Sequence, residues 1–144
     1  MMKNDNDLFF TCSLIEYIGR VCRLQRKQVV EYLGVEYLKR IYKYAGTLHC
    51  EPMEKVANDY IEMRKITNGD FDNIKSCKYE VPDYWTIGKV YGRLIEDVAG
   101  NEIVETLIVV YGSWISEAIS NYNSDFYYQS REYICKCYLE GKMI

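Results

Sequence analysis

Hydrophobic positions recur at helical spacing along most of the chain, so the sequence predicts an all-α fold. Over residues 8–24 the apolar side chains fall in two adjacent stripes, and only a narrow polar face is left, formed by Ser13, Glu16, Arg20 and Arg23. A helix that is apolar over most of its circumference packs against neighbours on more than one side. We therefore expect this first helix to lie at the centre of the molecule.

Six separate windows in all carry this period, and the chain is predicted to form a single compact bundle of about seven helices. Gly34 is suited to end a short helix, Pro52 to open one in its first turn, and Asp83 to cap another. Gly100 and Asn101 separate the fifth helix from the sixth, which is the most apolar. The expected helices cover residues 8–24, 26–33, 35–50, 52–61, 84–99 and 101–118, and a last helix or helix pair covers residues 125–140.

Residues 67–83 lose the helical period and predict one long irregular segment. Such a long stretch without regular structure is unusual in a compact domain, and segments of this kind often carry function. It is also the only candidate boundary in the chain. We expect one helical domain, 1–144, in which residues 8–66 and 84–141 form two parts of one core.

Composition narrows the class of protein. The chain has 144 residues, of which 49% are hydrophobic and 27% charged, values that exclude a disordered or collagen-like chain. The polar N-terminus lacks the features of a secretory signal, and no apolar run is long enough to span a membrane. Six cysteines are present, and Cys12, Cys22 and Cys137 occupy apolar helical positions, as buried free thiols do. We expect a cytoplasmic protein with no membrane contact.

Catalytic and metal-binding patterns are weak. Cys135 and Cys137 are two residues apart and would point to different sides of a helix, which does not suit a shared zinc ion. Neither phosphate-binding glycine motif occurs, so we expect no metal and no cofactor. His49 is the single histidine, and its place near a helix end favours a capping role over catalysis. A small enzyme that uses His49 ranks third among the functional hypotheses.

Basic residues concentrate in the first half of the chain. Residues 1–66 contain 11 Lys/Arg and 9 Asp/Glu, whereas residues 67–144 contain 7 and 12, which gives charges of +2 and −5. Two short helices joined at Gly34 could form a helix-turn-helix, although Glu36 and the acidic overall charge weigh against DNA. A DNA-binding regulator is therefore the alternative function, and nucleic acid is not the expected partner. Its candidate contacts are Arg23, Arg26, Lys27, Lys39, Arg40 and Lys43.

Aromatic residues give the better functional indication. The chain contains fifteen tyrosines, several of them in or beside irregular segments. Tyrosine and tryptophan offer a large contact area at low entropic cost and are common anchors in protein interfaces. Lys89 and Arg93 lie four residues apart on the outer face of the expected fifth helix. The candidate partner-binding residues are Tyr79, Tyr84, Trp85, Lys89 and Arg93.

Five stretches within residues 8–62 carry a resemblance to known proteins: residues 8–17, 29–38, Ile41-Tyr42, Leu48-His49 and 56–61. Through them the chain resembles a family of short bacterial proteins of unknown function that occur in toxin–antitoxin-type gene pairs. Some members look like partners of ADP-ribosyltransferase-like toxins, so the resemblance implies a regulatory or neutralising protein that binds a toxin-like enzyme. Our leading hypothesis is a non-enzymatic, antitoxin-like, protein-binding module.

Overall fold

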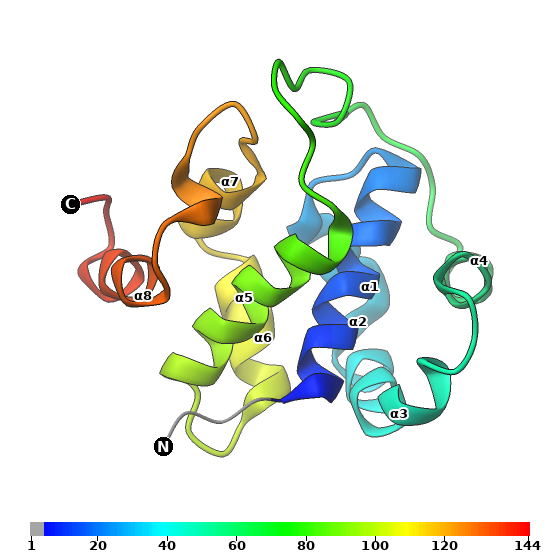
Figure 1. The fold of residues 1–144 in the computed structure, drawn as a ribbon. Coiled ribbons are helices and arrows are strands. Elements are labelled where there is room, and N and C mark those ends of the chain that lie inside the picture. Colours follow the sequence, from blue (N-terminus) through cyan, green and yellow to red (C-terminus); the bar gives the residue numbers. More distant parts are fainter. Residues whose placement is uncertain (1–4) are drawn as a thin grey trace.

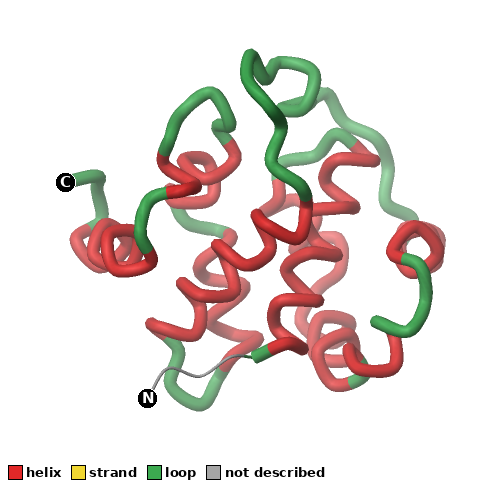
Figure 2. Tube along the Cα trace, in the orientation of Figure 1, coloured by secondary structure: helices red, strands yellow, loops and turns green. Residues whose placement is uncertain are grey.

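The computed structural model describes residues 5–144, and this part of the chain contains helices and no strand (Figures 1 and 2). The all-α prediction is confirmed. The helices are α1 (Asn6–Cys22), α2 (Arg26–Lys43), α3 (Ala45–Leu48), α4 (Met53–Met63), α5 (Tyr84–Val98), α6 (Ile103–Tyr111), α7 (Trp114–Ser120), the 3-10 helix η1 (Phe126–Tyr128) and α8 (Arg131–Glu140).

Helix α1 is the central element, as its sequence predicts. It packs against α2, α3, α4 and, most extensively, α5, which runs beside it in Figure 1. Asp5 caps its start by accepting a hydrogen bond from the backbone N–H of Leu8 at 3.0 Å. Burial extends to the polar face, because Ser13 and Glu16 are fully buried. Val21, an apolar residue near the end of the helix, is by contrast exposed to solvent.

Two glycines of α5 allow its close approach to α1. A Cβ atom on Gly88 would lie 2.8 Å from the Cα of Ser13, and one on Gly92 would lie 2.4 Å from a ring carbon of Phe9. These distances are shorter than real Cβ contacts, so only glycine fits at this crossing. The four-residue spacing of Gly88 and Gly92 therefore serves helix packing.

Two predicted helices differ from the structure. Gly34 has a φ of 76° and breaks α2 as expected, but the helix after it ends at Lys43 and α3 follows as a separate turn. The sixth predicted helix, 101–118, is wrong as a continuous element. It divides into α6 and α7, which are bent by 71°, because Ser113 caps α7 through its side chain and accepts from the N–H of Ile115 at 3.4 Å.

The buried side chains form one core to which both parts of the chain contribute. The segment 67–83 is irregular, as predicted, and crosses one end of this core (Figure 2). Its first residues are fixed to the end of α1, because the N–H groups of Gly69 and Phe71 donate to the carbonyls of Cys22 and Arg23, both at 2.9 Å. The long segment is therefore attached to the bundle through its backbone.

Within residues 5–144 no single helix is long and apolar enough to cross a membrane. Helices α6 and α7 reach that length and composition only when taken together.

The α1–α5 crossing can be tested with alanine. Gly88→Ala should lower the free energy of unfolding by about 2 kcal/mol or more, because the new methyl group meets the backbone of Ser13. Gly46→Ala is the matched control, since a Cβ atom there has no neighbour within 4 Å, and it should leave stability unchanged or slightly higher. Urea unfolding of both variants measures the difference, and equal stabilities would contradict the crossing.

Candidate functional site

A buried ion-pair network lies where α1, α2 and α7 approach one another. Glu16 of α1 accepts from Arg26 at both carboxylate oxygens, at 2.8 Å from Nε and 3.0 Å from Nη2. Arg20, one turn further along α1, donates its Nε to the same carboxylate at 2.7 Å, and the Tyr122 hydroxyl also donates to it. Glu16 and Arg26 are almost completely buried.

These contacts determine the protonation of the network. Burial alone would raise the pKa of Glu16, but the charges and hydrogen bonds of Arg26 and Arg20 and the hydrogen bond from Tyr122 lower that pKa to about 2. Burial lowers the pKa of Arg26, and the Glu16 carboxylate more than offsets this and raises it above its usual value. The network therefore stays ionised at neutral pH.

Asn73 extends the network into the segment 67–83. Its side-chain oxygen accepts from Arg26 Nη2 at 3.1 Å, and its Nδ2 donates to the backbone carbonyl of Ser120 at 3.0 Å. At the other end of the segment, Arg20 Nη2 donates to the carbonyl of Pro82 at 2.6 Å. One buried carboxylate thus connects α1, α2, the irregular segment and the end of α7.

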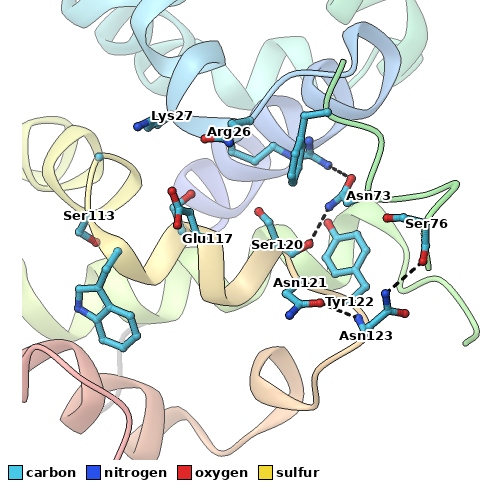
Figure 3. Close-up of a pocket in the computed structure, with 15 residues that line it drawn as sticks. Arg26, Lys27, Asn73, Ser76, Ser113, Glu117, Ser120, Asn121, Tyr122 and Asn123 are labelled. Atoms are coloured by element: carbon cyan, nitrogen blue, oxygen red, sulfur yellow. Dashed lines mark hydrogen bonds between the residues drawn. The ribbon is translucent and has the colours of Figure 1, made fainter. Parts of the chain in front are cut away.

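A cavity of about 530 Å³ lies beside this network (Figure 3). The start of α2, the irregular segment and α7 with the turn after it form its walls. Figure 3 shows Glu117 extending from α7 towards Arg26 and Lys27 at the start of α2. The lining residues are Gln25, Arg26, Lys27, Phe71, Asn73, Ser76, Gly112, Ser113, Trp114, Ser116, Glu117, Ser120, Asn121, Tyr122 and Asn123.

A second depression of about 270 Å³, here called the cationic groove, lies between α5 and the η1–α8 segment. Tyr128 on its edge is 67% exposed. Arg131 is neutralised by Glu96 and Asp97, at N–O distances of 3.2 and 2.8 Å. None of the lining residues, all of which are described, is acidic. They are Thr86, Lys89, Val90, Arg93, Leu94, Tyr127, Tyr128, Gln129, Arg131 and Ile134.

The predicted partner-binding residues are divided among three places. Lys89 and Arg93 are exposed and line the cationic groove together. Tyr84 and Trp85 are half-buried outside it, and Tyr84 packs edge-on against Tyr17 with ring centroids 5.1 Å apart. Tyr79 is 69% exposed in the irregular segment. Of the five residues, only Lys89 and Arg93 line the groove, and the rings of Tyr84 and Trp85 pack against Tyr17 and His49.

The predicted nucleic-acid contacts do not form one basic surface. Arg26 is 1% exposed and paired with Glu16, so its assignment as a DNA contact is wrong. Lys39 pairs with Glu105 at 2.9 Å, and the guanidinium of Arg40 lies 4.8 Å from the ring centre of Tyr37. Lys43 lies similarly over the ring of Tyr44. The two remaining residues are Arg23, which ends α1, and Lys27, on the rim of the cavity.

His49 ends α3, and its backbone N–H donates to the carbonyl of Ala45 at 2.8 Å. Its ring packs against aromatic neighbours, with centroids 5.5 Å from Phe10 and 5.2 Å from Trp85. The predicted burial of Cys12, Cys22 and Cys137 is confirmed. Burial raises the pKa of the Cys12 thiol to about 12. In the described part of the chain no three His, Cys, Asp or Glu side chains are grouped as metal ligands.

Sequence reasoning missed Glu16, Asn73 and Tyr122. The position of Glu16 in a helix that is apolar on both sides was the available signal, because a carboxylate buried there requires a cationic partner.

Comparisons of the chain with protein-family models, curated proteins and solved structures found no match.

Acid should weaken the network in a defined pH interval. Because the folded-state pKa of Glu16 lies below its ordinary value, the stability that its ionisation provides is complete above about pH 5 and is lost as the pH falls towards 2, by roughly 3 kcal/mol. Glu16→Gln cannot titrate, so its stability should fall less over this interval. It should also be less stable at pH 5, because Arg26 keeps its buried charge.

Urea unfolding at several pH values between 5 and 2 measures this dependence. Glu132→Gln, at an exposed position of α8, is the control and should follow the unmodified protein. An identical acid dependence in Glu16→Gln would show that this carboxylate does not carry the effect.

The role of Asn73 can be measured separately. Asn73→Ala removes the hydrogen bonds to Arg26 and to the Ser120 carbonyl, so it should cost about 2 kcal/mol of stability and make trypsin cleave sooner at Lys75 and Lys78. Asn68→Ala, at an exposed site in the same segment, should change neither quantity. Equal cleavage rates in the two variants would argue against Asn73 as the anchor.

Proposed function

We propose that the protein is a non-enzymatic, cytoplasmic protein-binding module of the antitoxin-like kind, which regulates or neutralises a partner protein. The observation that supports this best is the cationic groove, where Lys89 and Arg93 lie beside Tyr127 and Tyr128 with no acidic residue among the lining. The groove is positive in a chain whose net charge is −3, so its charge is a local feature.

The groove has the residue types that anchor protein interfaces. Tyrosine and arginine are enriched at interface hot spots, and the exposed ring of Tyr128 offers apolar area beside the cations. Lys89 and Arg93 project from α5, whose opposite face is buried against α1, so their backbone is fixed before a partner arrives. Preordered anchors lose less entropy on binding than anchors on a mobile segment.

The charge of the groove indicates the chemistry of the partner. Lys89 and Arg93 are exposed and form no ion pair with any described residue, so both charges remain available. An acidic segment that also carries apolar or aromatic side chains would complement the two cations and the tyrosines. The resemblance of residues 8–62 supports a toxin-like enzyme as the protein that presents this segment.

Charge reversal tests the proposal. Lys89→Glu with Arg93→Glu should weaken binding of the partner that copurifies with the native protein by at least about tenfold, with the melting temperature unchanged, because both side chains are exposed. The same double variant should lose binding to a synthetic peptide of alternating glutamate and phenylalanine. Affinity purification with quantitative mass spectrometry and fluorescence anisotropy measure the two effects.

Lys136→Glu with Lys142→Glu is the matched control, because it changes the net charge equally at exposed sites outside the groove. This control should bind both the partner and the peptide normally. If both double variants lost the same binding affinity, the loss would be due to the overall charge of the protein and not to the groove. Unchanged binding in the groove variant would contradict the proposed docking site.

A further inference from the structure

The polar cavity of Figure 3 is separate from the cationic groove and has the size of a ligand site. Its volume of about 530 Å³ falls in the range of pockets that hold small molecules. Its floor is the Arg26–Asn73–Ser120 chain of hydrogen bonds, and Glu117 extends beside this chain towards Arg26 and Lys27. We propose that this cavity binds a small, uncharged, hydroxyl-rich molecule of the sugar or nucleoside class.

The charges of the lining residues are balanced when the direct partner of Arg26 is counted with them. Arg26 makes a bidentate contact with Glu16, and the remaining charged lining residues, Lys27 and Glu117, are exposed and of opposite sign. Arg20, the second arginine bound to Glu16, lies outside the lining. A ligand with a net charge would lose hydration on entry without gaining a net opposite charge. An uncharged ligand avoids this cost.

The remaining lining matches hydroxyl groups. Four serines, three asparagines and one glutamine line the cavity, and each of these side chains can both donate and accept a hydrogen bond, as a ligand hydroxyl does. Three aromatic residues, Phe71, Trp114 and Tyr122, line the same cavity and offer apolar surface to the face of a sugar ring or a base.

One wall of the cavity is already ordered. Asn123 accepts from the Lys78 N–H at 2.7 Å and donates to the Ser76 carbonyl at 3.1 Å, while Asn73 is held by Arg26 and Ser120. By contrast, the Glu117 carboxylate and the Ser76 hydroxyl make no hydrogen bond to other described residues, so both are available to a ligand. A fixed wall with free polar groups at its rim reduces the entropy lost on binding.

Matched pairs of probes test both the charge and the source of the ligand. Adenosine and AMP form one pair, and methyl glucoside and glucose 6-phosphate form the other. In calorimetric titration of the full chain, the uncharged member of at least one pair should bind at least about tenfold more tightly than its phosphorylated counterpart. The pair that binds identifies the ligand as nucleoside-like or sugar-like. Glycine tests a zwitterion and should bind more weakly than the uncharged probes.

Glu117→Lys makes the rim net positive and should reduce the preference for the uncharged probe by at least about tenfold, through tighter binding of the phosphorylated one. Glu132→Lys, exposed on α8, and the groove variant Lys89→Glu with Arg93→Glu should leave the preference unchanged. Three results would overturn the proposal: no binding of either uncharged probe, tighter binding of a phosphorylated probe or glycine, or equal behaviour of Glu117→Lys and Glu132→Lys.

Discussion

The buried carboxylate of Glu16 is the interaction on which the arrangement of this bundle depends. An ionised group without contact to water is costly unless it is paired and hydrogen-bonded, and Glu16 meets this condition through Arg26, Arg20 and Tyr122. Arg26 comes from the start of α2, Arg20 from α1 itself and Tyr122 from the turn after α7. The fold must therefore bring these segments together in one geometry, because any looser packing would leave charge buried and unpaired.

The helical period of the sequence is sufficient to predict most of the fold. It does not show where the chain changes direction within a continuous apolar pattern. The stripe from Ile103 to Tyr111 continues through Trp114 to Ser120, so periodicity alone joins α6 and α7. Ser113, a good N-cap residue, was the available sign of a new helix start. The burial of Arg26 was also out of reach, because four neighbouring basic residues resemble a surface cluster until the fold brings Glu16 against one of them.

The candidate sites were predictable to the extent that they lie within one element. Lys89 and Arg93 share a face of α5, so their spacing alone places them together. Their aromatic neighbours in the groove, Tyr127 and Tyr128, are more than thirty residues away, and the docking of η1 and α8 on α5 is a tertiary result that no local pattern contains. Tyr84 and Trp85 are near in sequence but face α1 and α3 instead. The polar cavity has walls from three distant segments, which explains why it was missed.

The cavity and the cationic groove are structurally connected through the segment after α7. Tyr122 lines the cavity and donates to Glu16, while its ring packs edge-on against Tyr127 of the groove, with centroids 5.7 Å apart. Arg20 also contacts the Tyr122 ring, and its guanidinium lies 5.5 Å from the centre of that ring. A displacement of the Tyr122 ring would therefore reach Tyr127 through direct contact. The buried ion pair forms the floor of the cavity and, through Tyr122, is one contact away from the aromatic side of the groove.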